Sequence, residues 1–328
     1  MSRSRIALLL LGAAALAPAV IAAAQTPLET AKSLFDAGRY TDAQAVLRAE
    51  IAKSANQPVL YYWLARSSFE LRQNDQAVND AERAVELEPK NSEFHHFLAT
   101  ASGYKAEGSG WFSGLSLARK AQREFFEAVQ LDPSNIPAQR DLINFYIAAP
   151  GIAGGGEDKA EDQIKKLEAI DSVQAHLARL SLYHNQKKWN QAVEEANAVI
   201  AARPKEAAPY LEIADYYVGR EGFAGMRTAL GAIPSTAAHQ RRTDYYRGVA
   251  DVIAGDNAQE AESLLKAYIA GGPVRREDRA SLAAAHTWLG RLFEKIGRRT
   301  EAMAEYRSAA DLDPKDKIAR EGLKRVGG

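Results

Sequence analysis

Histidines are the side chains of this sequence best suited to metal binding or acid–base chemistry. The chain has six of them. No two are four residues apart, so no helix face presents the paired imidazoles of an H-E-x-x-H metal site. The nucleophile motif G-x-S-x-G is absent. The absence of cysteine excludes disulfides, thiolate metal sites and a cysteine nucleophile. The sequence therefore predicts no catalytic residue, no cofactor and no metal.

One glycine-rich segment, residues 150–159, has the composition of a phosphate-binding loop. Such a loop can hold phosphate at the N-terminus of the helix that follows. A P-loop, however, requires G-x-x-x-x-G-K-[ST], and here Glu157 and Asp158 follow the glycines. These carboxylates would repel phosphate, whereas they suit the positive end of a helix. The segment is thus interpreted as a structural loop.

The composition sets further limits on function. The chain has 328 residues, 46% of them hydrophobic, with 42 basic and 42 acidic side chains. A nucleic-acid-binding protein usually has a strong basic excess, so the balance excludes this class. The length suits one or two globular domains or one repeat array.

Residues 58–91 show the element that organises the chain. Tyr61, Leu64, Ala65 and Ser68 have the spacing of one face of a helix. Asn74 and Asp75 are good N-cap residues for a second helix, which Pro89 would end. The segment predicts two short amphipathic helices, which cannot bury their apolar faces without stacked neighbours.

A 34-residue helix–turn–helix unit that ends in proline resembles the tetratricopeptide repeat family. Leu64 and Ala65, Ala77, Ala84 and Pro89 match the family's pattern of large, small and closing residues. The same register runs along residues 25–316, where it predicts an all-α solenoid of about eight repeats. The expected copies are 24–57, 58–91, 92–135, 136–172, 173–206, 207–236, 242–275 and 283–316, followed by a capping helix and tail at 317–328.

Residues 1–24 have the pattern of an export signal. Arg3 and Arg5 precede an apolar, alanine-rich run, and Ala22-Ala23-Ala24 has the A-x-A form of a cleavage site. A retained membrane anchor is the alternative, because the run is about as long as the minimum bilayer span. We expect cleavage, a periplasmic or secreted protein, and no stable membrane insertion afterwards.

Two adjacent copies are longer than the repeat. The third has ten extra residues within Lys105–Ala118, where Trp111 and Phe112 lie among glycines, and the fourth has five extra residues. Two interpretations stay open: the aromatic rings plug a gap in the array, or they form an exposed anchor for a partner. Since both insertions follow a first helix, we expect Trp111 and the Gly154–Gly156 loop to be neighbours. An exported bacterial subgroup of the family is similar in carrying both insertions.

The family resemblance also implies which residues line the inner face of the array. It predicts a basic and aromatic N-terminal half that contacts a partner through Tyr62, Arg66, Phe69, His96, Arg140 and Asn144. Arg140 and Asn144 fit the start of a set that, in some family members, grips a peptide's terminal carboxylate. Ala178 departs from that set. Two interpretations stay open: a preference for acidic or aromatic extended segments, or a solvated polar face that binds no partner.

The resemblance implies a non-catalytic scaffold that binds a partner protein or peptide through its concave face and the insertion edge. An accessory or chaperone-like subunit of a cell-envelope assembly machine is the alternative. An enzyme is the disfavoured class, because no acid–base group is recognisable.

Overall fold

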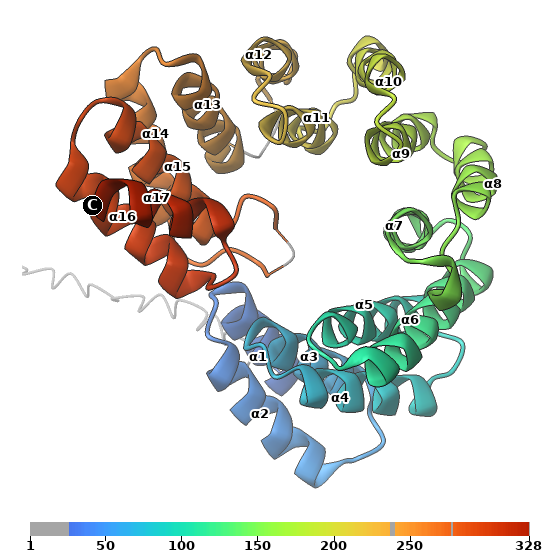
Figure 1. Cartoon of the computed structure of the whole chain (residues 1–328). Coiled ribbons are helices and arrows are strands. Elements are labelled where there is room, and N and C mark those ends of the chain that lie inside the picture. Colours follow the sequence, from blue (N-terminus) through green and yellow to red (C-terminus); the bar gives the residue numbers. More distant parts are fainter. Residues whose placement is uncertain (1–25, 237–239, 277, 328) are drawn as a thin grey trace, which may run out of the picture.

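The structure is a computed structural model that describes residues 26–236, 240–276 and 278–327. The predicted signal peptide lies outside the described residues. Within them, every regular element is a helix, as the sequence predicts (Figure 1). The helices are α1 Pro27–Asp36, α2 Tyr40–Lys53, α3 Pro58–Glu70, α4 Asn74–Leu87, α5 Ser92–Glu107, α6 Trp111–Leu131, α7 Ile136–Ala148, η1 Gly151–Ala153, α8 Glu157–Glu168, α9 Ser172–Asn185, α10 Trp189–Ala202, α11 Ala208–Val218, α12 Phe223–Gly231, α13 Gln240–Ala254, α14 Ala258–Ala270, α15 Leu282–Lys295, α16 Arg299–Leu312 and α17 Lys317–Gly327.

Consecutive helices pair as antiparallel hairpins because small residues lie where they cross. The recurring small position of each second helix is fully buried in every copy. It holds Met226 in the sixth copy and alanine in the others, namely Ala43, Ala77, Ala121, Ala160, Ala192, Ala261 and Ala302. An alanine side chain lets two helix backbones approach closely, and each hairpin then buries its remaining apolar face against the next one.

The ten extra residues of the third copy lengthen its two helices. Helices α5 and α6 have 16 and 21 residues, whereas α3 and α4 have 13 and 14, and only residues 108–110 connect α5 to α6. The expectation of an insertion in the turn between the helices is therefore wrong. Alanine and leucine in the segment favour helix on both sides of the glycines. The result is a hairpin that is longer than its neighbours.

The array curves so far that the connection between α14 and α15 contacts the first repeats (Figure 1). Residues 273–276, between α14 and α15, are here called the clasp. Arg275 Nη2 donates to Asp36 Oδ1 at 2.9 Å, and Arg276 Nη1 donates to Asn74 Oδ1 at 2.8 Å. These contacts join residues more than 200 positions apart, so the solenoid closes on itself instead of ending as an open superhelix.

Within the part of the chain that the structure describes, no helix is long and apolar enough to cross a membrane.

Candidate functional site

The inner face of the closed array carries two connected grooves. The first has a volume of about 740 Å³ and lies between α3, α5 and the start of α7. The second has a volume of about 960 Å³ and extends from α5 and α6 to α13. Both are lined by His96, Thr100 and Pro137, so they form one continuous surface, here called the inner groove. Of the predicted partner-binding residues, the inner groove brings together Tyr62, Arg66, Phe69, His96, Arg140 and Asn144.

Tyr62 and Phe69 form the wall of the first groove and do not project into it. Their exposed fractions are 6% and 2%. The Tyr62 hydroxyl donates to Glu93 Oε1 at 2.5 Å, and burial raises the pKa of Tyr62, so the phenol stays protonated. Side chains of α5 pack on both rings, Phe94 on Tyr62 and Phe97 on Phe69, and the Arg276 guanidinium also covers Phe69, 4.4 Å from its ring centroid. Both rings therefore expose little surface, and their contact with a partner stays a prediction.

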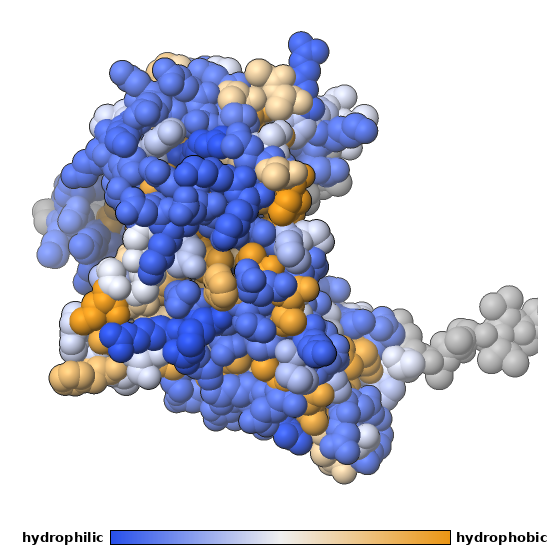
Figure 2. Space-filling model, turned by 90° about the vertical axis from the view of Figure 1, so that its right-hand side faces the viewer, coloured by the Kyte–Doolittle hydropathy of each residue, from blue (hydrophilic) through white to orange (hydrophobic). Residues whose placement is uncertain are grey.

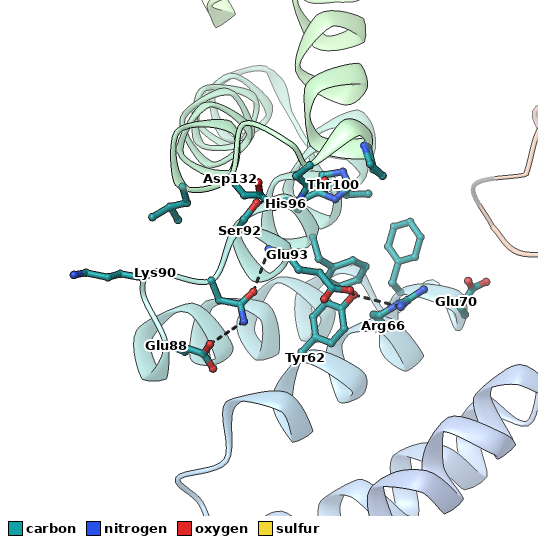
Figure 3. A pocket seen from close by; sticks show the side chains of 16 residues that line it. Tyr62, Arg66, Glu70, Glu88, Lys90, Ser92, Glu93, His96, Thr100 and Asp132 are labelled. Atoms are coloured by element: carbon teal, nitrogen blue, oxygen red, sulfur yellow. Dashed lines mark hydrogen bonds between the residues drawn. The ribbon is translucent and has the colours of Figure 1, made fainter. Parts of the chain in front are cut away.

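Arg66 is held in place by the same aromatic wall. Its guanidinium lies 4.8 Å from the Trp63 ring centroid and 5.1 Å from that of Phe35. Arg66 Nη1 also donates to the Tyr62 hydroxyl at 3.3 Å. Figure 3 shows Tyr62, Arg66 and Glu93 pointing toward one another. The side chain is half-buried and preorganised on one face of the groove.

Arg140 does not form a carboxylate clamp. Its guanidinium pairs with Glu212 and donates to Gln174 Oε1 at 3.0 Å. Both partners come from later repeats, and Glu212 already neutralises the guanidinium charge that would bind a peptide carboxylate. Asn144 lines the second groove and has no hydrogen bond from its side chain within the described residues. Its side chain is therefore free to bind a partner in the groove.

The charge of the inner groove is acidic, which contradicts the predicted basic surface. Its basic side chains are mostly paired: His96 with Asp141, Arg242 with Asp278 and Arg279 with Asp215. Nine carboxylates line the groove against five lysines and arginines. The carboxylates are Glu70, Glu88, Glu93, Glu107, Asp132, Asp141, Glu212, Asp215 and Asp278, and the cations are Arg66, Lys90, Arg140, Arg242 and Arg279. The balance was not evident from the sequence because the acids come from four different repeats and from the connection between α14 and α15.

Three histidines link the two helices of their own repeats. His95, His176 and His286 occupy the same position in their repeats, and each places Nδ1 2.6–2.7 Å from a glutamate of the second helix, Glu124, Glu195 or Glu305. In the described residues, no group of three or more His, Cys, Asp or Glu side chains is placed to hold a metal ion. The glutamate partner raises the pKa of His95.

The same position also joins neighbouring repeats, a role that sequence reasoning missed. His95 Nε2 lies 3.0 Å from the carbonyl oxygen of Pro89, the closing proline of the preceding repeat. Gln139 and Tyr210 donate to the carbonyls of Pro133 and Pro204 in the same way, at 3.0 and 3.1 Å. The sequence signal that could have revealed this link between repeats is a histidine, glutamine or tyrosine six residues after a closing proline.

Sequence reasoning also missed two S-x-x-K spacings, Ser102 to Lys105 and Ser263 to Lys266. In β-lactamases this spacing places a lysine beside a nucleophilic serine. Here Ser102 is fully buried, and Lys105 Nζ lies 2.8 Å from Asp75 Oδ1. Lys266 Nζ lies 2.6 Å from Glu262 Oε1. Both lysines are thus paired with carboxylates and do not activate a serine.

The glycine-rich loop is closed on itself. The backbone N–H groups of Gly154, Gly155 and Gly156 donate to the carbonyls of Gly151, Pro150 and Tyr146. Lys159 Nζ donates to the Gly154 carbonyl at 2.8 Å. These donors are the ones that a phosphate would need, so the geometry agrees with a structural loop.

Trp111 and Phe112 lie at the tip of the α5–α6 hairpin, with exposed fractions of 71% and 85%. The interpretation that they plug the array is therefore wrong. The glycine-rich loop packs on α6 at Arg119, which donates to the Ile152 carbonyl at 3.0 Å. Eight residues of helix, about 12 Å, separate that contact from Trp111. The two insertions share an edge, but the loop and Trp111 are not in contact.

Comparisons with known proteins agree with this architecture. Family models described as tetratricopeptide repeat match residues 34–101 and 283–316, and the second match has the bounds that the sequence predicts for the last copy. A tetratricopeptide repeat protein from Parabacteroides merdae is similar in structure, with a TM-score of 0.50, 14% identity, and coverage of 92% of this chain and 98% of that one. A thermophilic tetratricopeptide protein of Thermus thermophilus is also similar, with a TM-score of 0.44, 20% identity, and coverage of 53% and 89%. No curated protein shows a significant match to the chain.

Proposed function

We propose that this tetratricopeptide-repeat protein is a non-catalytic scaffold that holds an extended segment of a partner protein in its inner groove. The observation that supports the proposal is the continuity of the groove from α3 to α13, with side chains already fixed by ion pairs and ring contacts. Preorganised groups lose little conformational freedom on binding, which favours affinity. The net acidic lining favours a segment with basic side chains.

Site-specific crosslinking tests the proposal. A photoreactive residue is placed at Pro137 or Asn144, which line the groove and are not buried, and at Glu86, which is exposed and outside it. The chain is then irradiated in its native compartment. We expect the same partner to crosslink from both groove positions and not from Glu86. Equal crosslinking from all three positions would contradict the proposal.

The hairpin tip is proposed as a second contact. Figure 2 shows the outer face as mostly hydrophilic with separate hydrophobic patches. Trp111 and Phe112 are the most exposed large hydrophobic side chains among the described residues, and adjacent aromatic rings are typical anchors of protein interfaces.

The place of action is proposed from residues 1–24. Their signal-like composition supports export to the periplasm or beyond, where the chain would serve as a scaffold or an accessory subunit of an envelope assembly machine. An intact mass that begins at Gln25 is expected. A mass that retains Met1, recovered with membranes, would reverse the localisation.

A further inference from the structure

The clasp is bound to the first repeats in the manner of a ligand, through its arginine side chains. The Arg276 guanidinium lies 4.4 Å from the Phe69 ring centroid and 4.8 Å from that of Tyr104. It donates to the Phe69 carbonyl and to Asn74 Oδ1, each at 2.8 Å, while the Arg276 backbone N–H donates to Glu70 Oε2 at 2.9 Å. Aromatic faces and neutral acceptors thus surround the guanidinium, while a carboxylate holds the backbone of the same residue.

Arg275 fills a second pocket beside the first. Its guanidinium lies 4.0 Å from the Phe35 ring centroid and donates to Asp36 Oδ1 at 2.9 Å and to the Phe35 carbonyl at 3.2 Å. The ring of Pro273 lies so close to Gly38 that no side chain could replace the glycine's hydrogen. Two consecutive arginines thus enter two adjacent pockets, anchored by a proline.

The Arg276 pocket is continuous with the inner groove, and the Arg275 pocket lies beside it. Phe69 and Glu70 also line the first groove, and Tyr104 lines the second. Asp278 and Arg279, just beyond the clasp, line the second groove as well. A segment bound along the inner groove therefore reaches the surface that the clasp now covers.

We propose that the partner segment carries two adjacent arginines, which bind the pockets of Arg275 and Arg276 and displace the clasp. This inference rests on the proposed function. The clasp is then an internal competitor: its own Pro-Val-Arg-Arg sequence occupies the site until a stronger ligand arrives. The nine carboxylates of the groove supply the complementary charge. Lysine is a poor substitute, because its ammonium neither stacks as a plane nor forks between two acceptors.

Peptide binding to the full chain tests the competition. The probe is a fluorescent peptide with the sequence of residues 269–276, compared with a version in which both arginines are lysines. The proteins are the unchanged chain, R275A/R276A, and the matched control R307A/R320A. The control removes the same number of positive charges, from exposed arginines outside the groove.

We expect R275A/R276A to bind the arginine peptide about tenfold or more tightly than the other two proteins, because the site is free in a larger fraction of molecules. The lysine peptide should bind R275A/R276A about tenfold more weakly than the arginine peptide does.

Equal affinity for all three proteins would overturn the inference, and so would the absence of binding to R275A/R276A.

A second measurement does not depend on the folding of that variant. In the unchanged chain, saturating arginine peptide should accelerate hydrogen exchange at the Arg276 amide, which now donates to Glu70. Unchanged exchange with peptide bound would overturn the displacement. If a partner crosslinks to Pro137 and Asn144 but the peptide does not bind, only this inference fails. Without groove crosslinks, the scaffold function fails.

Discussion

The two ends of the α5–α6 hairpin differ although the same two helices build both. At the inner end, Ala99 and Ala121 are fully buried and Phe125 is 7% exposed. At the tip, Trp111 is 71% exposed and Phe112 is 85% exposed. Repeats stack on both sides of the inner end, whereas the hairpin is ten residues longer than its neighbour and its tip extends beyond them. The burial of an aromatic ring is therefore set by its place in the stack, not by residue type.

The largest expected effect is at the inner end. Phe125→Ala should lower the free energy of unfolding by about 3–5 kcal/mol, because it leaves a cavity between two stacked repeats. Urea denaturation measures the loss. Phe112→Ala is the matched control, since it removes the same ring from the tip. Equal losses for the two variants would remove the distinction between the ends.

A smaller effect is expected halfway along the hairpin, where the glycine-rich loop packs on α6. A Cβ on Gly155 would lie 1.8 Å from the Ala149 carbonyl oxygen, so Gly155→Ala must distort the loop. We expect a loss of about 1–3 kcal/mol in the free energy of unfolding. Gly151→Ala, where a Cβ meets nothing within 4 Å, should cost much less. A Gly155→Ala chain as stable as Gly151→Ala would show that the loop is loosely packed.

The hydrogen bond between His95 and Glu124, at the inner end of the hairpin, should contribute about 1 kcal/mol to the free energy of unfolding. This contribution should depend on pH. Glu124, with Glu127 nearby, raises the pKa of His95. A raised pKa in the folded chain means that the stabilisation is present below the ordinary histidine pKa of about 6.5 and is lost as pH rises through the folded-state value. His95→Gln keeps a donor for the Pro89 carbonyl, as Gln139 shows for Pro133.

Unfolding of the unchanged chain and of His95→Gln is compared at pH 5.5 and pH 8.5. The advantage of histidine should be larger at the lower pH. The other histidines are common to both proteins, so their contributions cancel in the difference. An advantage that grows with pH would mean that His95 is bound in its neutral form.

The smallest effect on stability is expected at the tip. Trp111→Ala and Phe112→Ala together should change the free energy of unfolding by less than about 0.5 kcal/mol, because exposed side chains make few contacts. If the rings anchor a partner, the same variant should lose it in co-purification, at a cost of about 2 kcal/mol or more in binding. Unchanged co-purification would leave the tip without a role in binding.

The helical repeat was predictable because its determinants are local. Ala65, Ala77 and Pro89 lie within one 34-residue unit, and small residues and prolines at that spacing indicate crossing and closing points. The exposure of Trp111 was not predictable, since it depends on how far α5 and α6 continue.

The chemistry of the groove was not predictable because it is set by superhelical curvature. Small rotations between successive repeats accumulate along the array, and they bring Glu212 to Arg140 and Arg276 to Asn74. Asn74 is instructive: it has the residue type of an N-cap, yet α4 begins after Gln73 without a side-chain cap, and the Asn74 oxygen accepts from Arg276.

Closure by the clasp has a consequence for the order in which the chain folds. Contacts between neighbouring helices are local, and proteins rich in local contacts fold quickly. The clasp joins Arg275 to Asp36 across 239 positions, so its formation must close a far longer loop. During synthesis the first repeats are complete long before Arg275 is made. They can therefore fold and expose empty arginine pockets to other chains before their own clasp arrives.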